Sequence, residues 1–207
     1  IDHTGQGQID QRTFGITGSP EDGCAEVVEH VENHTAEVNA LVMVVDCNRK
    51  DTLGGIDFTV ANGENASEIH GISSTAAREI FDAGVDLITL GNHTYGRKDI
   101  CTLLSDEQNI IRPANYPPLC PGGGYTVLDV DGYKILCMNV LGTALMEPLA
   151  CPFETVDKIL DREKGSYDLS LLDVHAEATS EKIALARYFD GRINIIFGTH
   201  THVPTAD

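Results

Sequence analysis

The sequence predicts an α/β fold, because short apolar strands alternate with amphipathic helices over most of its 207 residues. Two further observations support this class. A β-hairpin interrupts the alternation, with strands 125–130 and 133–140 joined across Asp131-Gly132, a dipeptide that favours tight hairpin turns. Several strands also end in polar, metal-competent residues, and ligands of open α/β sheets bind at the carboxyl ends of strands.

The N-terminal part is less regular than the rest. Residues 1–12 are polar and rich in Gly and Gln, so we expect a tail there. Residues 13–20 are expected to form a short strand that runs into a Gly-Ser-Pro turn. Apolar residues at an imperfect helical spacing predict an amphipathic helix over 22–38. The apolar, β-branched run 41–45 predicts a strand that ends at Asp46.

From residue 56 onward the alternation is clear. Ser73 or Ser74 is a suitable N-cap for a helix that Gly84 would end. The expected strands cover 56–61, 85–90, 110–115, 169–174 and 193–196, and the expected helices cover 74–83, 98–104, 153–164 and 180–189.

Composition narrows the function classes. A net charge of −18 argues against a surface that binds duplex nucleic acid, which needs a basic patch. The charge is compatible with a small phosphate substrate, because bound cations invert the local field. The sequence lacks an apolar run of about 18 residues, so we expect no membrane span. The six cysteines form no CxxC motif, which favours a reducing cytoplasm.

Four strand ends carry possible ligands, and they repeat one layout. An apolar strand is followed each time by a carboxylate, an amide or an imidazole. Each residue alone is more typical of a turn or a helix cap, but independent turns give no reason for the repetition. The ligand types suit Mn, Fe, Mg or Zn, and the absence of Cys from all four strand ends argues against a structural zinc site. The candidates are Glu64 and Asn65, Asn92 and His93, His175, and His200 and His202.

The ligand mixture favours phosphate-ester chemistry. Two metals that share a carboxylate can activate a water and hold both the attacking and the leaving oxygen. His93 follows Asn92 directly, and it is therefore placed to act as a general acid toward the leaving group.

Five segments together resemble the YmdB-like branch of the calcineurin-like metallophosphoesterases, over about Gly55 to Asp207. They are Gly63–Ala66, Gly91–Thr94, Arg112–Pro117, Asp173–Lys182 and Gly198–Val203.

The resemblance implies a four-layer α/β/β/α sandwich, a dinuclear centre of iron, manganese or magnesium (with zinc as an alternative), and phosphodiesterase activity on 2′,3′-cyclic nucleotides. Glu64 would bridge the metals, and His202 would serve the second one. Asn65 would be a further ligand or a substrate contact. His93 would be the acid, and we assign no ligand role to His70 or Thr94. Asn92, His175 and His200 would complete the coordination of the first metal.

The chain departs from the family pattern in two places. The family's first strand ends in Gly-Asp, whose Asp binds metal, but residues 14–20 contain no Asp. Residues 36–52 are an atypical extra segment within a domain expected over 13–207. Asp46 in that segment could substitute, although a parallel crossover to the strand at 56 would need more than the roughly ten residues available. Asp10 is a weaker candidate.

The second departure is that the family pattern continues past residue 207. We therefore expect a sandwich that is incomplete at its C-terminus, or a homo-oligomer that covers the sheet edge. The missing Asp leaves open a non-catalytic, metal-binding regulatory module. A nucleotidase or a protein phosphatase is a weaker alternative, because a protein phosphatase would show Asp-x-His at the first strand.

Overall fold

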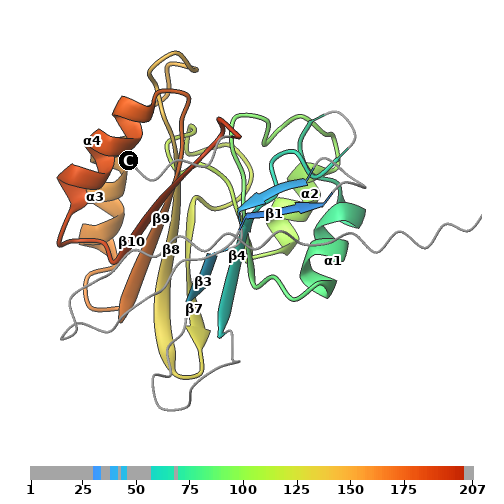
Figure 1. The fold of residues 1–207 in the computed structure, drawn as a ribbon, viewed down its shortest axis with the longest axis horizontal. Coiled ribbons are helices and arrows are strands. Elements are labelled where there is room, and N and C mark those ends of the chain that lie inside the picture. The colour runs from blue at the N-terminus through green and yellow to red at the C-terminus, as the bar shows by residue number, and fades with distance from the viewer. Residues whose placement is uncertain (1–29, 34–37, 42, 46–56, 68–69, 203–207) are drawn as a thin grey trace, which may run out of the picture.

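The described residues form two four-stranded sheets packed face to face, with helices on both outer sides (Figure 1). In this computed structural model, 57–67 and 70–202 are described in full, and 30–33, 38–41 and 43–45 as strands. Helices α3 and α4 lie to the left of the sheets in Figure 1, and α1 and α2 lie to the right.

The first sheet has the strand order β3-β4-β5-β6. Strands β4, β5 and β6 are parallel, and β3 pairs with β4 in the antiparallel sense. Helices α1 and α2 connect the parallel strands. The bounds are β3 (Met43–Val45), β4 (Phe58–Asn62), α1 (Ser74–Asp82), β5 (Leu87–Thr89), α2 (Ile100–Asp106) and β6 (Ile110–Ile111).

The second sheet has the strand order β10-β9-β8-β7. Strands β8, β9 and β10 are parallel, and β7 forms the predicted antiparallel hairpin with β8. Asp131 and Gly132 in its turn have positive φ angles of 50° and 89°, as a type I′ turn requires. The bounds are β7 (Tyr125–Val130), β8 (Tyr133–Leu141), α3 (Pro152–Arg162), β9 (Leu169–His175), α4 (Thr179–Phe189) and β10 (Ile195–Thr199).

Three apolar clusters hold the layers together and confirm the four-layer α/β/β/α sandwich. One packs α1 and α2 on the first sheet, and another packs α3 and α4 on the second. The third lies between the sheets and draws from both. Its buried members are Phe58, Val60, Leu87, Ile111, Ile135, Cys137, Leu171 and Ile195.

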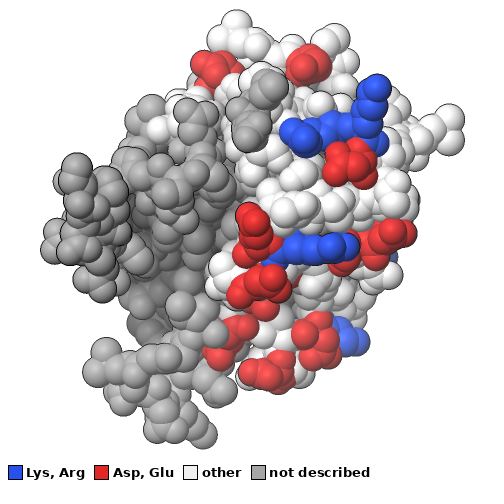
Figure 2. Space-filling model, turned by 90° about the vertical axis from the view of Figure 1, so that its right-hand side faces the viewer, with Lys and Arg blue, Asp and Glu red and all other residues white. Residues whose placement is uncertain are grey.

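The exposed side of the α1 and α2 layer carries mixed charge. Figure 2 shows acidic and basic side chains interspersed there, without a continuous basic patch among the described residues. Such a mixture is typical of a solvated face, while the apolar sides of both helices pack on the sheet. In the part of the chain that the structure describes, no helix is both long and apolar enough to cross a membrane.

From residue 57 the predicted elements are confirmed, with shifts at their ends. The Ser73 hydroxyl accepts a hydrogen bond from the Ala76 amide at 3.1 Å and caps α1, and Gly84 follows this helix with a φ of 98°. The strand expected over 110–115 ends at Ile111. Its continuation leaves the ladder because the Arg112 amide donates to the Gly123 carbonyl instead.

Before residue 57 the predictions were less accurate. The helix expected over 22–38 is wrong where the structure describes it, because β1 (His30–Asn33) pairs in the antiparallel sense with β2 (Val38–Leu41). The helical period was imperfect, and β-branched valines in both segments favour a pleated strand. The strand expected over 41–45 is divided, since Leu41 ends β2 and β3 begins at Met43.

The tail 1–12 and the strand 13–20 lie outside the described residues, as do Asp10 and Asp46. Val45, which precedes Asp46, pairs with Phe58 at the start of β4. The end of β3 therefore lies at the sheet edge opposite to the one reached by the end of β4. The antiparallel pairing also means that no parallel crossover joins β3 and β4.

Candidate metal centre

Polar side chains from both sheets meet at the carboxyl ends of their parallel strands. Glu64 follows β4, Asn92 follows β5, His175 ends β9, and His200 follows β10. We call these four residues the first cluster. Glu64 is the expected bridging carboxylate, and the other three are the expected ligands of the first metal. The structure brings all four close together.

His175 is the centre of the first cluster. Its Nε2 lies 2.9 Å from Glu64 Oε2, 3.0 Å from Asn92 Oδ1 and 3.1 Å from His200 Nδ1. The ligand atoms of Glu64, His175 and His200 all lie within 4.8 Å of one another. Glu64 and His175 are buried, with 2% and 1% of their surfaces exposed. One cation could therefore contact all four side chains.

The cluster fits a cation because one of its buried carboxylate oxygens has no hydrogen bond. Glu64 Oε2 is buried without a hydrogen bond, and it lies 2.9 Å from His175 Nε2. Asn65 Oδ1 is also buried without one. An unsatisfied buried oxygen is costly, and a bound cation would remove that cost. Gly91 keeps the space open, because a Cβ there would overlap Glu64 Oε2 and His175 Nε2.

Asn65 and His202, which we call the second pair, lie beside the first cluster. Asn65 Nδ2 is 3.4 Å from His202 Nε2, and His202 is exposed. Both residues were predicted ligands, and the structure places them next to each other. The carboxylate expected to complete the second metal is not among the described residues.

The loop after β10 is held in an unusual conformation. His200 and His202 have positive φ angles of 94° and 54°, a region that L residues rarely adopt. Thr201 between them accepts a hydrogen bond from Lys182 Nζ at 3.2 Å. Burial lowers the pKa of Lys182. Backbone strain of this kind persists where the surrounding structure enforces it, as at binding sites.

Glu177 orients the ring of His200. Its Oε2 lies 2.9 Å from His200 Nε2, and both side chains are partly buried. A carboxylate on Nε2 leaves Nδ1 with its lone pair toward the first cluster, as in many metal-binding histidines. Burial, and then the nearby His175, lower the pKa of His200, so its ring stays neutral to a lower pH.

Two buried carboxyl groups of the site have shifted pKa values. Burial opposes ionisation of Glu64, but the contact with His175 and the other nearby histidines outweigh it and lower the pKa of Glu64. Complete burial raises the pKa of Asp173, while His175 and a hydrogen bond from Thr89 act in the opposite direction.

His93, the predicted acid, lies beside the first cluster and outside it. Its Nε2 is 3.4 Å from Asn92 Nδ2, and its ring stacks on His70 with centroids 4.2 Å apart. Thr94 has a structural role, because its buried hydroxyl donates to the Gly91 carbonyl at 2.6 Å and closes the turn. The structure thus gives contacts to His70 and Thr94 that are not those of ligands.

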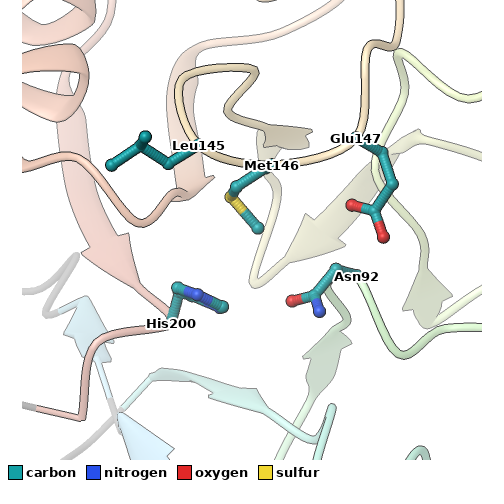
Figure 3. Close-up of a pocket in the computed structure, with 5 residues that line it drawn as sticks. All are labelled: Asn92, Leu145, Met146, Glu147 and His200. Carbon is teal, nitrogen blue, oxygen red and sulfur yellow. The ribbon is translucent and has the colours of Figure 1, made fainter.

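A cavity of about 380 Å³ opens beside the first cluster. Figure 3 shows Asn92 and His200 on one side of it and three residues of the loop after β8 on the other, with Met146 pointing into the space between them. Leu145 in that loop is 87% exposed and has a φ of 65°. The cavity lining is Asn92, Leu145, Met146, Glu147 and His200.

Contacts with α4 and with the segment before it hold this loop in place. The Glu181 carboxylate accepts hydrogen bonds from the Thr143 amide at 2.9 Å and the Ala144 amide at 3.0 Å. Met146 Sδ accepts from the Glu177 amide at 3.3 Å. The same segment therefore positions both the cavity wall and His200.

The sequence interpretation assigned no role to Asp173, Glu177, Glu181 or the loop after β8. Asp173 could have been found, because residues i and i+2 of a strand share a face and His175 is a predicted ligand. The contacts of Glu181 with the loop cross 37 and 38 positions of the chain, and no local pattern marks them.

The family model described as "YmdB-like protein" matches residues 39–207. The 2′,3′-cyclic-nucleotide 2′-phosphodiesterase of Bacillus subtilis (strain 168) is 41% identical over 150 residues, which cover 72% of this chain and 57% of that protein. The chain spans 55–57% of the length of the curated relatives that it matches.

Two solved structures share the fold. A hypothetical protein from Thermus thermophilus superposes with a TM-score of 0.70 at 48% identity, over 73% of this chain and 59% of that one. A structure described as a novel phosphatase from Mycoplasma pneumoniae gives a TM-score of 0.68 at 36% identity, over 73% of this chain and 56% of that one.

Proposed function

The chain belongs to the YmdB-like protein family, and on this premise we propose that it is a metal-dependent phosphodiesterase acting on small phosphodiesters such as 2′,3′-cyclic nucleotides. The resemblance inferred from its motifs is confirmed. The convergence of Glu64, Asn92, His175 and His200 beside a cavity carries the proposal. The name of the Bacillus subtilis relative supports the substrate class.

In this proposal the first cluster would hold one divalent cation, and Glu64 would also be a ligand of a second one. Asn65 and His202 serve that second cation, so the centre is dinuclear. Divalent cations bound here supply Lewis-acid activation of water and neutralise phosphate charge. Iron, manganese or magnesium suits the mixed oxygen and imidazole donors, and zinc is an alternative. Asp46 stays an untested prediction for the remaining ligand.

The protein's own groups then bind and protonate the substrate. The phosphodiester lies in the cavity between Asn92 and the loop after β8, with Asn92 orienting a phosphoryl oxygen through its amide group. His93 follows Asn92, which lines the cavity, and gives a proton to the leaving oxygen. His70, stacked on His93, fixes the plane of that ring. A cytoplasmic location and a homo-oligomer stay predictions.

The test is metal-stimulated turnover by the 207-residue chain. Hydrolysis of bis-p-nitrophenyl phosphate and 2′,3′-cAMP is measured with added Mn²⁺ or Fe²⁺. We expect turnover that His175→Ala abolishes and that Lys158→Ala, on the exposed side of α3, leaves unchanged. Equal turnover in His175→Ala and the parent chain would refute the proposal. Metal binding without turnover by the parent would instead identify the non-catalytic module.

A further inference from the structure

A buried carboxylate lies under the first cluster and contacts none of its ligands with its own oxygens. Asp173 belongs to β9, two residues before His175, and is completely buried. It accepts hydrogen bonds from both sheets. Thr89 Oγ1 of β5 lies 2.6 Å and Asn62 Nδ2 of β4 lies 3.1 Å from its Oδ2, and Thr199 Oγ1 of β10 lies 2.7 Å from its Oδ1.

Thr199 connects this carboxylate to His175. Its hydroxyl oxygen lies 2.7 Å from Asp173 Oδ1 and 2.9 Å from His175 Nδ1. The Thr199 hydroxyl donates to Asp173 Oδ1, and a hydroxyl has a single proton. The Thr199 proton is therefore committed to Asp173, so the Thr199 oxygen accepts a hydrogen bond from His175. This requires the proton of the neutral imidazole to be on Nδ1.

The consequence appears at the other nitrogen of the ring. With the proton on Nδ1, the lone pair of His175 Nε2 points at Glu64 Oε2, Asn92 Oδ1 and His200 Nδ1. In the metal-free chain the two oxygens are acceptors that favour a proton on Nε2, so the hydrogen bonds through Thr199 must outweigh them. With the opposite tautomer, a proton would occupy the place of a cation. A ring can bind a cation through Nε2 only in the first of these two states.

We propose that Asp173 and Thr199 are positioning residues that fix His175 in its Nδ1-protonated tautomer and so prepare the first cluster for a divalent cation. The inference rests on the proposed metal site, but it does not require turnover. Thr89 and Asn62 donate to the other carboxylate oxygen, Oδ2, which does not contact Thr199.

Asp173→Asn reverses the polarity of this chain with almost no change in shape. Thr89 and Asn62 both donate to the Oδ2 position, so the amide oxygen of the new side chain belongs there. Its amide nitrogen then faces Thr199 and donates to the hydroxyl oxygen. The hydroxyl proton turns toward His175 Nδ1, and the imidazole proton moves to Nε2.

The experiment reads the tautomer directly and then measures cation binding. In the metal-free full chain at pH 8, ¹⁵N chemical shifts and two-bond ¹H–¹⁵N couplings of His175 report which nitrogen carries the proton. We expect Nδ1–H in the parent and Nε2–H in Asp173→Asn. Titration calorimetry with Mn²⁺ then gives the affinity, which we expect to fall about tenfold or more in Asp173→Asn and Thr199→Val.

Two control variants separate this role from a merely structural one. Thr199→Ser keeps the hydroxyl and should restore Mn²⁺ affinity to within about twofold of the parent. Thr89→Val removes a hydroxyl bond of similar length to the same carboxylate, on the side away from His175. It should lower the melting temperature about as much as Thr199→Val does. Mn²⁺ affinity should stay within about threefold of the parent, which is a smaller loss than the removal of a group that orients a metal ligand causes.

An Nε2-protonated His175 in the parent chain overturns the proposal, whether or not any variant folds. Equal losses of Mn²⁺ affinity in Thr89→Val and Thr199→Val overturn it as well. If the parent shows the expected tautomer and binds Mn²⁺ but hydrolyses no phosphodiester, the proposed function fails and the positioning role stands.

Discussion

His200 and His202 are two residues apart on one loop, yet they differ in burial and in the groups that surround them. His200 is partly buried, has the Glu177 carboxylate on one nitrogen and faces His175 with the other. His202 is exposed and lies near the Asn65 amide. The first is oriented from two directions before any cation binds. The difference indicates that the donors of the first cluster are already oriented for a cation. The donors of the second pair would become ordered only when a second cation binds.

The largest expected effect compares alanine at these two positions. His200→Ala should weaken Mn²⁺ binding by more than about 100-fold, because it removes a direct ligand and direct ligands exceed the range for outer-shell groups. His202→Ala should keep one tightly bound Mn²⁺ per chain and lose a weaker one. Titration calorimetry and the electron paramagnetic resonance of bound Mn²⁺ measure both. Identical losses of Mn²⁺ binding in the two variants would show that the first cluster and the second pair form a single site.

A smaller effect is expected when only the support of His200 is changed. Glu177→Gln keeps an acceptor for His200 Nε2 but removes the charge that raises the basicity of the ring. Mn²⁺ affinity should fall about tenfold, the lower end for such groups, since the Glu177 side chain is half exposed. Glu79→Gln, on the exposed side of α1, is the matched control. An unchanged affinity in Glu177→Gln would mean that Glu177 has no part in preparing the site.

The smallest effect concerns the metal-free protein and its pH dependence. The pKa of His200 is lowered in the folded state, so the unfolded chain binds the proton more strongly. Stability is therefore full above the ordinary His pKa of about 6.5 and decreases as the pH falls toward the lower folded value. Thermal unfolding between pH 7 and pH 5 should show a fall in melting temperature of a few degrees. His200→Gln should reduce this fall, and an equal fall in the variant would refute the assignment.

The elements from residue 57 could be predicted because their signals are local. Ser73 caps α1, Asp131-Gly132 forms the hairpin turn, and apolar runs form the buried strands. The ligands could be predicted because each follows a strand, and strands of one direction end at one edge. The segment around β1 and β2 could not, since its apolar residues fit no single period and strand pairing decides its conformation.

The orienting groups were beyond sequence reasoning for a different reason. Asp173 acts through contacts with Thr89 and Asn62, which are 84 and 111 positions away in the chain. Only the docking of one sheet on the other brings these residues together. A carboxylate in an apolar strand could be recognised as unusual, but its partners are set by tertiary structure.

The first cluster takes its donors from both sheets, with Glu64 and Asn92 from one and His175 and His200 from the other. A cation bound there would be a cross-link between the two halves of the sandwich. At a concentration 100 times its dissociation constant it would add about 2.7 kcal/mol to the free energy of unfolding. The melting temperature of the chain should then rise with the concentration of added cation, because the bound cation connects the two sheets.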